Sequence, residues 1–400
     1  MEDHVVRFPA AASPARWGAV LAMTLCVATL IASEFMPVSL LTPIGADLHM
    51  TEGRAGQAIA VSGFFAVVTS LLIASVTRGI DRRTVLLSMA LLMILSGAMV
   101  ALAPNPLIFM AGRALLGVVI GGFWSLSTAT LMRLVPHGDV PRALGLLNGG
   151  NALATTIAAP LGSFLGQYVG WRGAFFAVVP LGVLTLVWLF MSLPPMPSER
   201  DARGGSVFRV LRRPQVSLGM LAVTLLFLGQ FALFTYLRPF METVTRVDVS
   251  TLSLLLLING AGGLLGTVLI SVMLRTRLYS VLISMPLLMA VIAVALTLYG
   301  ASPIAVGVLL AGWGLIGTAA PVGWSTWMSR VLHDDAEAGG GLMVAVIQLA
   351  ITLGATAGGL LYDRSGYQST FVFSAAALCA SALLAWLGWR TSRRPSGHQS

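Results

Sequence analysis

The sequence of 400 residues contains no lysine, only two cysteines and few charged side chains. Without lysine it cannot form a nucleotide-binding loop of the G-x-x-x-x-G-K-[ST] type, which excludes ATP-driven work by this chain alone. Cys26 and Cys379 lie in apolar runs near opposite ends of the chain, so we expect neither a disulfide nor a metal site. The H-E-x-x-H and G-x-S-x-G patterns are also missing. We therefore expect no enzyme activity, no metal and no cofactor.

Hydrophobic residues make up 57% of the chain and charged residues 10%, with a mean hydropathy of +0.89. Soluble domains have about 45–50% apolar and about 25% charged residues, so much of this surface must face lipid. Spans need about 20 apolar residues each. The sequence predicts an all-α membrane protein with twelve transmembrane helices, at residues 17–41, 55–76, 84–103, 107–134, 143–165, 174–193, 215–237, 251–274, 278–298, 304–327, 342–362 and 370–389.

The net charge of +9 comes entirely from arginines in short runs between the apolar segments. This pattern indicates membrane topology, and no nucleic-acid partner is expected. Eighteen arginines fall in segments that would be cytoplasmic if the N-terminus is inside. The five that would lie outside are Arg54, Arg172, Arg238, Arg246 and Arg364. We therefore expect a multi-pass protein of the bacterial inner membrane with both termini and the linker 194–214 in the cytoplasm.

An internal repeat divides the chain. Between residues 137 and 175, twelve of thirty-nine positions are identical to the residue 196 positions later, without a gap. The same offset pairs Phe35 with Phe231 and sets Glu34 opposite Gln230. Six spans per half give both halves the same orientation. We expect two parallel six-helix repeats, 1–193 and 215–400, which is a known layout of secondary transporters with a site between the halves.

Glu34 is the only acidic residue well inside an apolar run, and Arg113 is the only arginine well inside one, since Arg133 lies at the end of its run. Charged groups at membrane depth are costly and usually functional. Burial disfavours the carboxylate, so Glu34 is our candidate for taking up and releasing a proton. A permanently protonated Glu34 that bonds a neighbouring helix, or Arg113 as an anchor at a helix end, would be the structural alternative. We predict that both residues take part in proton coupling.

A substrate between the halves would meet amides and aromatic rings. Such groups suit a neutral, planar ligand that forms hydrogen bonds. Each aromatic residue could instead be a packing residue or an interface anchor. Trp313 and Trp324 are eleven residues apart, a spacing that places them on nearly one helix face. The candidates are Gln230, Phe234, Asn148, Asn151, Asn259, Phe123, Trp124, Trp313, Trp324 and Gln348.

Several short motifs resemble the major facilitator superfamily in its drug/proton antiporter branch. Asp81, Arg82 and Arg83 resemble the superfamily's loop after the second span, although Thr77 stands where a glycine is usual. Arg113 with glycines at 117 and 121 resembles the signature of the fourth span. Residues 159–162 (APLG) resemble the fifth-span signature of antiporters. This resemblance implies the major facilitator fold and makes 81–83 a candidate conformational-switch loop.

A more specific resemblance, from about residue 17 to residue 389, is to the bacterial purine ribonucleoside efflux pumps. It implies proton-coupled export of purine ribonucleosides such as inosine and guanosine, and we expect a monomer in the lipid bilayer. The shared strings are 34–41 (EFMPVSLL), 121–124 (GGFW), 132–136 (MRLVP), 229–231 (GQF), 321–327 (PVGWSTW) and 345–350 (AVIQLA).

Two other interpretations stay open at this point. The same fold could export sugars or drugs, which competition between these ligands would separate. A membrane sensor or polytopic membrane enzyme would need a soluble effector domain or a catalytic cluster. The longest loop, 194–214, is too short for the first, and the sequence offers no residues for the second.

Overall fold

The computed structural model describes residues 15–197, 213–331 and 336–392, and its elements are helical throughout this part of the chain. The helices, in chain order, are α1 (Trp17–Asp47), α2 (Glu52–Val76), α3 (Arg82–Ala101), α4 (Pro106–Leu134), η1 (His137–Asp139), α5 (Val140–Phe176), α6 (Val178–Ser192), α8 (Pro214–Phe234), α9 (Leu237–Phe240), η2 (Met241–Thr245), α10 (Val249–Tyr299), α11 (Pro303–Gly317), α12 (Ala320–Val331) and α13 (Ala336–Ser392).

Polar side chains cap the beginnings of several of these helices. Thr51, Asn105, Asp248 and Ser302 each accept a hydrogen bond from the backbone N–H three residues later, at the start of α2, α4, α10 and α11. Such caps satisfy N–H groups that have no partner within the helix. Proline follows directly at the first position of α4, α8 and α11, where its missing N–H costs nothing. The short polar connections in the sequence therefore coincide with helix ends.

Ten helical segments of the described chain are long and apolar enough to cross a membrane. Two of them, Arg142–Ser192 and Leu342–Thr391, have 51 and 50 residues, and at about 1.5 Å per residue each is long enough for two crossings. Each is interrupted by a glycine with positive φ, Gly170 at 71° and Gly366 at 75°. These glycines are equivalent in the 196-residue repeat. The helical segments are consistent with the twelve predicted spans.

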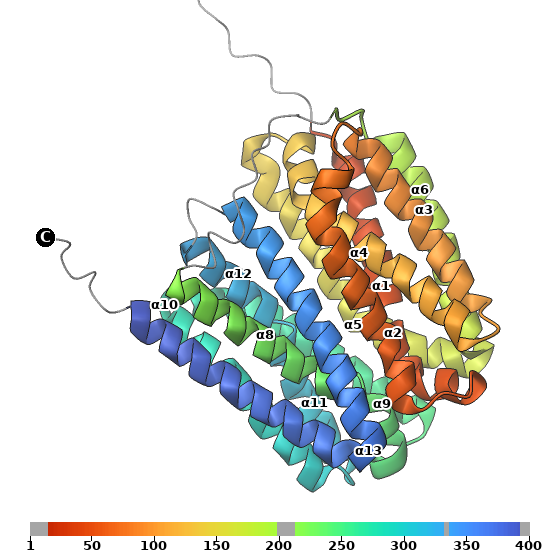
Figure 1. Cartoon of the computed structure of the whole chain (residues 1–400), viewed down its shortest axis with the longest axis vertical. Helices are drawn as coiled ribbons and strands as arrows, with labels where there is room; N and C mark the ends of the chain where they lie inside the picture. The colour runs from red at the N-terminus through yellow and green to blue at the C-terminus, as the bar shows by residue number, and fades with distance from the viewer. Residues whose placement is uncertain (1–14, 198–212, 332–335, 393–400) are drawn as a thin grey trace, which may run out of the picture.

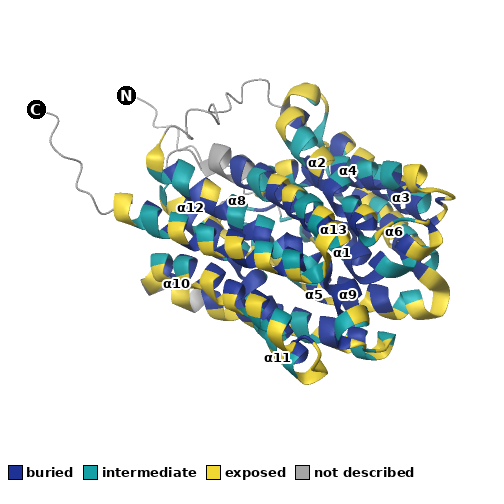
Figure 2. Ribbon diagram, turned by 60° about the horizontal axis from the view of Figure 1, so that its bottom comes forward, coloured by how far each residue is buried: buried dark blue, intermediate teal, exposed yellow. Residues whose placement is uncertain are grey.

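The helices gather into two groups, which Figure 1 shows as the red-to-yellow-green and the green-to-blue parts of the ribbon. We call α1–α6 the N-terminal group and α8–α13 the C-terminal group. Helix α2 packs against α13, and α5 packs against α10, across the boundary between the groups. In Figure 2 the buried residues lie mainly between the helices and the exposed ones on the outside. The exposed residues include large apolar ones such as Leu107 and Ile304. This distribution is that of a protein whose outer surface faces lipid.

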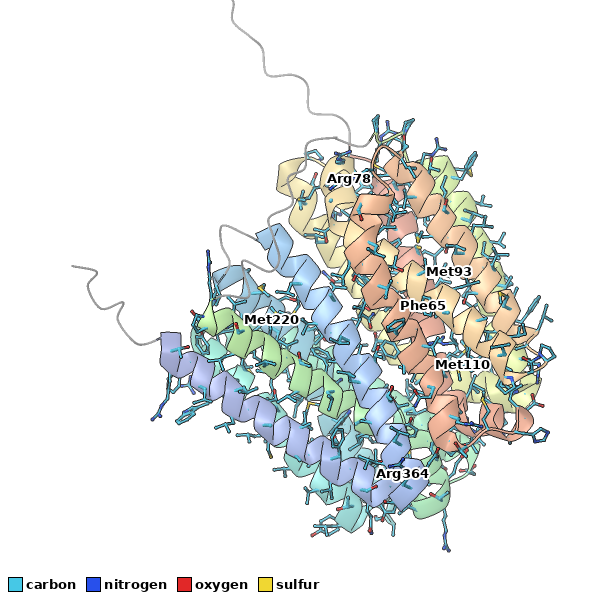
Figure 3. The ribbon with its side chains drawn as sticks, viewed as in Figure 1. Phe65, Arg78, Met93, Met110, Met220 and Arg364 are labelled. Atoms are coloured by element: carbon cyan, nitrogen blue, oxygen red, sulfur yellow. The ribbon has the colours of Figure 1, made fainter. Side chains whose placement is uncertain are left out.

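The two ends of the bundle differ in how the groups meet. We call the side where α6 ends and α8 begins the linker side, and the side where α1 ends and α2 begins the distal side. Figure 3 places Arg78 at the linker-side end of α2 and Arg364 near the distal bend of α13. Where both partners are described residues, hydrogen bonds between the groups lie at mid-depth or on the distal side. The groups are therefore held together on the distal side.

Candidate functional site

Glu34 lies in α1, in a stretch whose backbone is disturbed by a proline. Pro37 has no N–H, so the carbonyl of Ser33 lacks its usual partner four residues later. Arg113 of α4 fills this gap, because its Nη1 donates to Ser33 O at 2.7 Å. The proline in α1 thus creates an acceptor, and the arginine inside the fourth span is its donor.

The Arg113 guanidinium is buried and holds several acceptors at once. Its Nε donates to Ala58 O at 3.1 Å, and its Nη2 donates to Glu34 O at 3.1 Å and to Ser62 Oγ at 3.2 Å. Arg113 is 1% exposed and Glu34 is 4% exposed. Among the described ion pairs there is none between Arg113 and the Glu34 carboxylate, although the two charges act on each other. Arg113 therefore contacts the main chain of Glu34 and influences its carboxylate only through space.

The carboxylate of Glu34 reaches the C-terminal group. Gln348 of α13 donates from Nε2 to Glu34 Oε1 over 3.4 Å, and both side chains are buried. One turn along α13, Thr352 donates to the carbonyl of Ala60 in α2. Its repeat equivalent, Thr156 of α5, donates to the carbonyl of Gly260 in α10. Hydrogen bonds from a threonine to a backbone carbonyl therefore join the two groups at mid-depth, once between α13 and α2 and once between α5 and α10.

Aromatic rings fill the boundary beside Glu34. Phe35 stacks on its repeat equivalent Phe231 with ring centroids 5.8 Å apart, and Phe234 meets both rings edge-on. Gln230, in contrast, packs directly against Gly317 of α11. Each residue of a helix is rotated by about 100° from the one before it. The repeat therefore brings Phe35 and Phe231 together, while Glu34 meets Gln348 and not Gln230.

The remaining predicted residues lie at different depths. Asn259 packs beside Gly314 of α11, while Asn148 is exposed and Asn151 is half-buried on α5. Phe123 is fully buried in the core of the N-terminal group, and Trp124 packs against that core. Among the described residues, the hydrogen bonds of Glu34 outside α1 go to Gln348 and Arg113 and not to these residues. Their assignment to a substrate site remains a prediction.

The two candidate tryptophans lie in successive helices, whereas the prediction from their spacing assumed one continuous helix. The α-helix ends at Gly317 and starts again at Ala320, so Trp313 belongs to α11 and Trp324 to α12. Trp324 packs edge-on against Trp327 and lines a void of about 10 Å³. That volume is at the lower limit for one water molecule. Trp324 thus packs within the C-terminal group, and its assignment to a substrate site remains a prediction.

The predicted switch loop is bound to the end of α6. Asp81 accepts hydrogen bonds from the backbone N–H of Arg83 at 2.7 Å and of Met196 at 3.0 Å. The backbone N–H of Arg82 donates to Met196 O, and Arg83 donates to Phe190 O. All of these partners belong to the N-terminal group or to the residues just after it. A role for this loop in conformational switching remains a prediction.

Arg238 and Asp363 join the two groups on the distal side. Arg238 of α9, which we expected in an outer loop, is 6% exposed and donates to Ser39 O. Pro43 frees that carbonyl, just as Pro37 frees Ser33. Asp363 of α13 accepts from Thr51 Oγ1 at 2.6 Å and from Gly53 N at 2.9 Å, at the beginning of α2. The signal for Arg238 was present in Pro43, because this proline leaves the Ser39 carbonyl without its helical donor.

The sequence model of the Major Facilitator Superfamily matches residues 23–340. A relative from Pseudomonas aeruginosa, named transcription regulatory protein OpdE, is 58% identical over 385 residues, with 95% of this chain and 96% of the relative covered. The purine ribonucleoside efflux pump NepI of Shigella sonnei is 45% identical over 369 residues, with 92% and 93% covered. The crystal structure of a D-xylose-proton symporter has a TM-score of 0.76 at 16% identity, with 92% and 97% covered.

Proposed function

Because the chain belongs to the major facilitator superfamily, we propose that it exports purine ribonucleosides such as inosine and guanosine across the inner membrane in exchange for protons. The observation that carries the proposal is the buried carboxylate of Glu34, which is bonded across the boundary to Gln348. Substrate identity is supported by the relatives named as purine ribonucleoside efflux pumps.

In the proposed cycle the halves 1–193 and 215–400 rock about the central site, joined by the linker 194–214. Both termini and the linker face the cytoplasm, so the distal side faces outward and the state described here is closed to the outside. In this state Glu34 gives up its proton to the cytoplasm and nucleoside binds. When the distal side opens, Glu34 takes up a proton and nucleoside leaves. A ligand drives such a switch only through different affinities for the two states.

Aromatic rings beside Glu34 and buried amides of the C-terminal group suit the proposed cargo. Phe35, Phe231 and Phe234 offer ring faces and edges at the boundary between the groups. The amide oxygens of Gln230, Asn259 and Gln348 are buried and accept no hydrogen bond from a described residue. A purine base presents a flat ring with N–H donors to such groups.

Energised inside-out membrane vesicles test the proposal. We expect radiolabelled inosine to accumulate inside them, a protonophore to abolish the accumulation, and guanosine to compete while xylose and cationic drugs do not. Glu34→Gln should lose accumulation against a gradient, because it cannot exchange a proton. Asp248→Asn, the same chemical change at an exposed helix cap, should accumulate inosine normally. Wild-type accumulation by Glu34→Gln would remove Glu34 as the proton carrier.

The name of the OpdE relative raises regulation as a second candidate function. In the described residues, membrane-length helices and short connections leave no room for a soluble effector domain. Export could itself change transcription, because it lowers the cytoplasmic concentration of the exported compound. Vesicles carry out no transcription, so accumulation there measures transport alone. A chain that affects transcription but moves no nucleoside in vesicles would favour the regulatory function.

A further inference from the structure

The nitrogen and the oxygen of the Gln348 amide differ in their hydrogen bonding. Its Nε2 donates to Glu34 Oε1, while its Oε1 is buried and has no hydrogen-bond partner among the described residues. The side chain is 7% exposed. A buried acceptor without a donor costs about 1–3 kcal/mol. This oxygen is therefore ready to accept a hydrogen bond from a ligand.

The protonation state of Glu34 decides which end of the amide faces it. An ionised carboxylate only accepts hydrogen bonds, so Gln348 must present its NH₂ group, as it does here. A protonated carboxyl group can also donate, and the amide can then turn its oxygen toward Glu34. This rotation moves no helix and changes no charge on Gln348. It exchanges an acceptor for a donor on the side of the amide that faces away from Glu34.

We propose that Gln348 is the positioning residue that couples protonation of Glu34 to nucleoside affinity, an inference that rests on the proposed function. With Glu34 ionised, Gln348 Oε1 accepts a hydrogen bond from a ring N–H of the base, such as N1–H of a 6-oxopurine. Protonation of Glu34 turns the amide, and its NH₂ group then opposes the N–H of the base. Proton and nucleoside therefore compete without occupying the same place, as an antiporter requires.

The surroundings of Glu34 favour a response to its own protonation. Arg113 of α4 is the charged residue that acts on Glu34. Helix α2 contributes Ser62, which bonds Arg113, and α13 contributes Gln348. Neither of these two side chains titrates. Arg113 keeps its charge at all moderate pH values, so a change in affinity with pH in this region reports on Glu34.

Binding of inosine to the purified protein, measured from mildly acidic to mildly alkaline pH, tests the coupling. We expect wild-type affinity to fall as the pH is lowered, because Glu34 becomes protonated. Gln348→Met has a similar volume and no amide to turn. It should bind inosine about three- to ten-fold more weakly at alkaline pH, and its affinity should not change with pH. The control Gln230→Met should bind more weakly at every pH and keep the wild-type dependence.

A second measurement needs no variant. 1-Methylinosine lacks the N1–H donor, so the wild-type protein should bind it more weakly at alkaline pH and with little dependence on pH. Equal pH dependence for both nucleosides, or a wild-type dependence in Gln348→Met, would overturn the role of Gln348. If proton-driven export of inosine is normal in these cases, the proposed function still stands. Absence of any inosine binding or export would overturn both.

Discussion

Arg113 and Arg238 each donate a hydrogen bond to a backbone carbonyl of α1. Pro37 and Pro43 each leave a carbonyl without its helical donor, at Ser33 and Ser39, and an arginine supplies the missing hydrogen bond. The difference lies in where the arginines come from. Arg113 belongs to α4 of the same group, whereas Arg238 comes from α9 of the other group.

This difference separates a permanent contact from one that must be made and broken. If the two groups move as units, the bond from Arg113 persists through the transport cycle. The bond from Arg238 breaks whenever the distal side opens, and Asp363 then leaves the beginning of α2 as well. We therefore expect Arg113 to act on stability and proton coupling, and Arg238 and Asp363 to act on the balance between conformations.

The largest effect is expected for Arg113→Ala. The Ser33 carbonyl, which has no helical donor, is left unsatisfied at about 1–3 kcal/mol, and the carbonyls of Glu34 and Ala58 each lose a second donor. We therefore expect a loss of about 2 kcal/mol or more in unfolding free energy and no transport. Unfolding in detergent with a fluorescent thiol probe, together with the vesicle assay, measures both.

Pro37→Ala gives this prediction a matched test. An alanine restores a backbone N–H for Ser33 O, so Arg113→Ala should cost about 1 kcal/mol less when Pro37→Ala is also present. Identical costs in the two backgrounds would show that Arg113 does not stabilise α1 by replacing the donor that proline removes.

A smaller, conformational effect is expected for Arg238→Ala. Spin labels at Arg54 and Arg364, which are exposed on opposite groups at the distal side, report whether that side opens, once Cys379 is replaced by Ser. Arg238→Ala should populate a longer distance, because the closed state loses a buried contact between the groups. Arg172→Ala is the control, since Arg172 pairs with Asp47 inside one group. Equal changes in both variants would contradict a specific role for Arg238.

The smallest shift is expected for Asp363→Asn. The amide can still accept a hydrogen bond from Gly53 N, but the negative charge at the beginning of α2 is lost, which is worth about 0.3–1 kcal/mol at an exposed site. The population with an open distal side should rise by about two- to five-fold, less than in Arg238→Ala. High salt should reduce the difference from wild type. A change that salt leaves untouched would point to geometry as its cause.

Sequence alone was sufficient for the architecture because it depends on features that repeat. Apolar runs of membrane length predicted the spans. The 196-residue offset pairs Gly170 with Gly366, and the structure gives both the same positive-φ conformation. Glu34 and Arg113 were identified because charged residues inside apolar runs are rare. These features are local in the chain and can be read without knowledge of the packing.

The contacts between the groups could not be predicted in the same way. The repeat set Glu34 opposite Gln230, but contact depends on the direction in which each helix faces, and Gln348 is the amide that reaches Glu34. Arg238 looked like a loop residue because its burial results from α9 folding back on α1. Side-chain direction and the meeting of distant segments are properties of the folded chain.

Proton movement driven by nucleoside alone tests the central claim most directly. Purified protein is placed in liposomes that contain a pH-sensitive dye, with no pH gradient, and inosine is added outside. The account predicts that the lumen becomes alkaline as inosine enters and protons leave, and that Glu34→Gln shows no such change. A lumen that becomes acidic, or that stays unchanged while inosine enters, would contradict proton antiport.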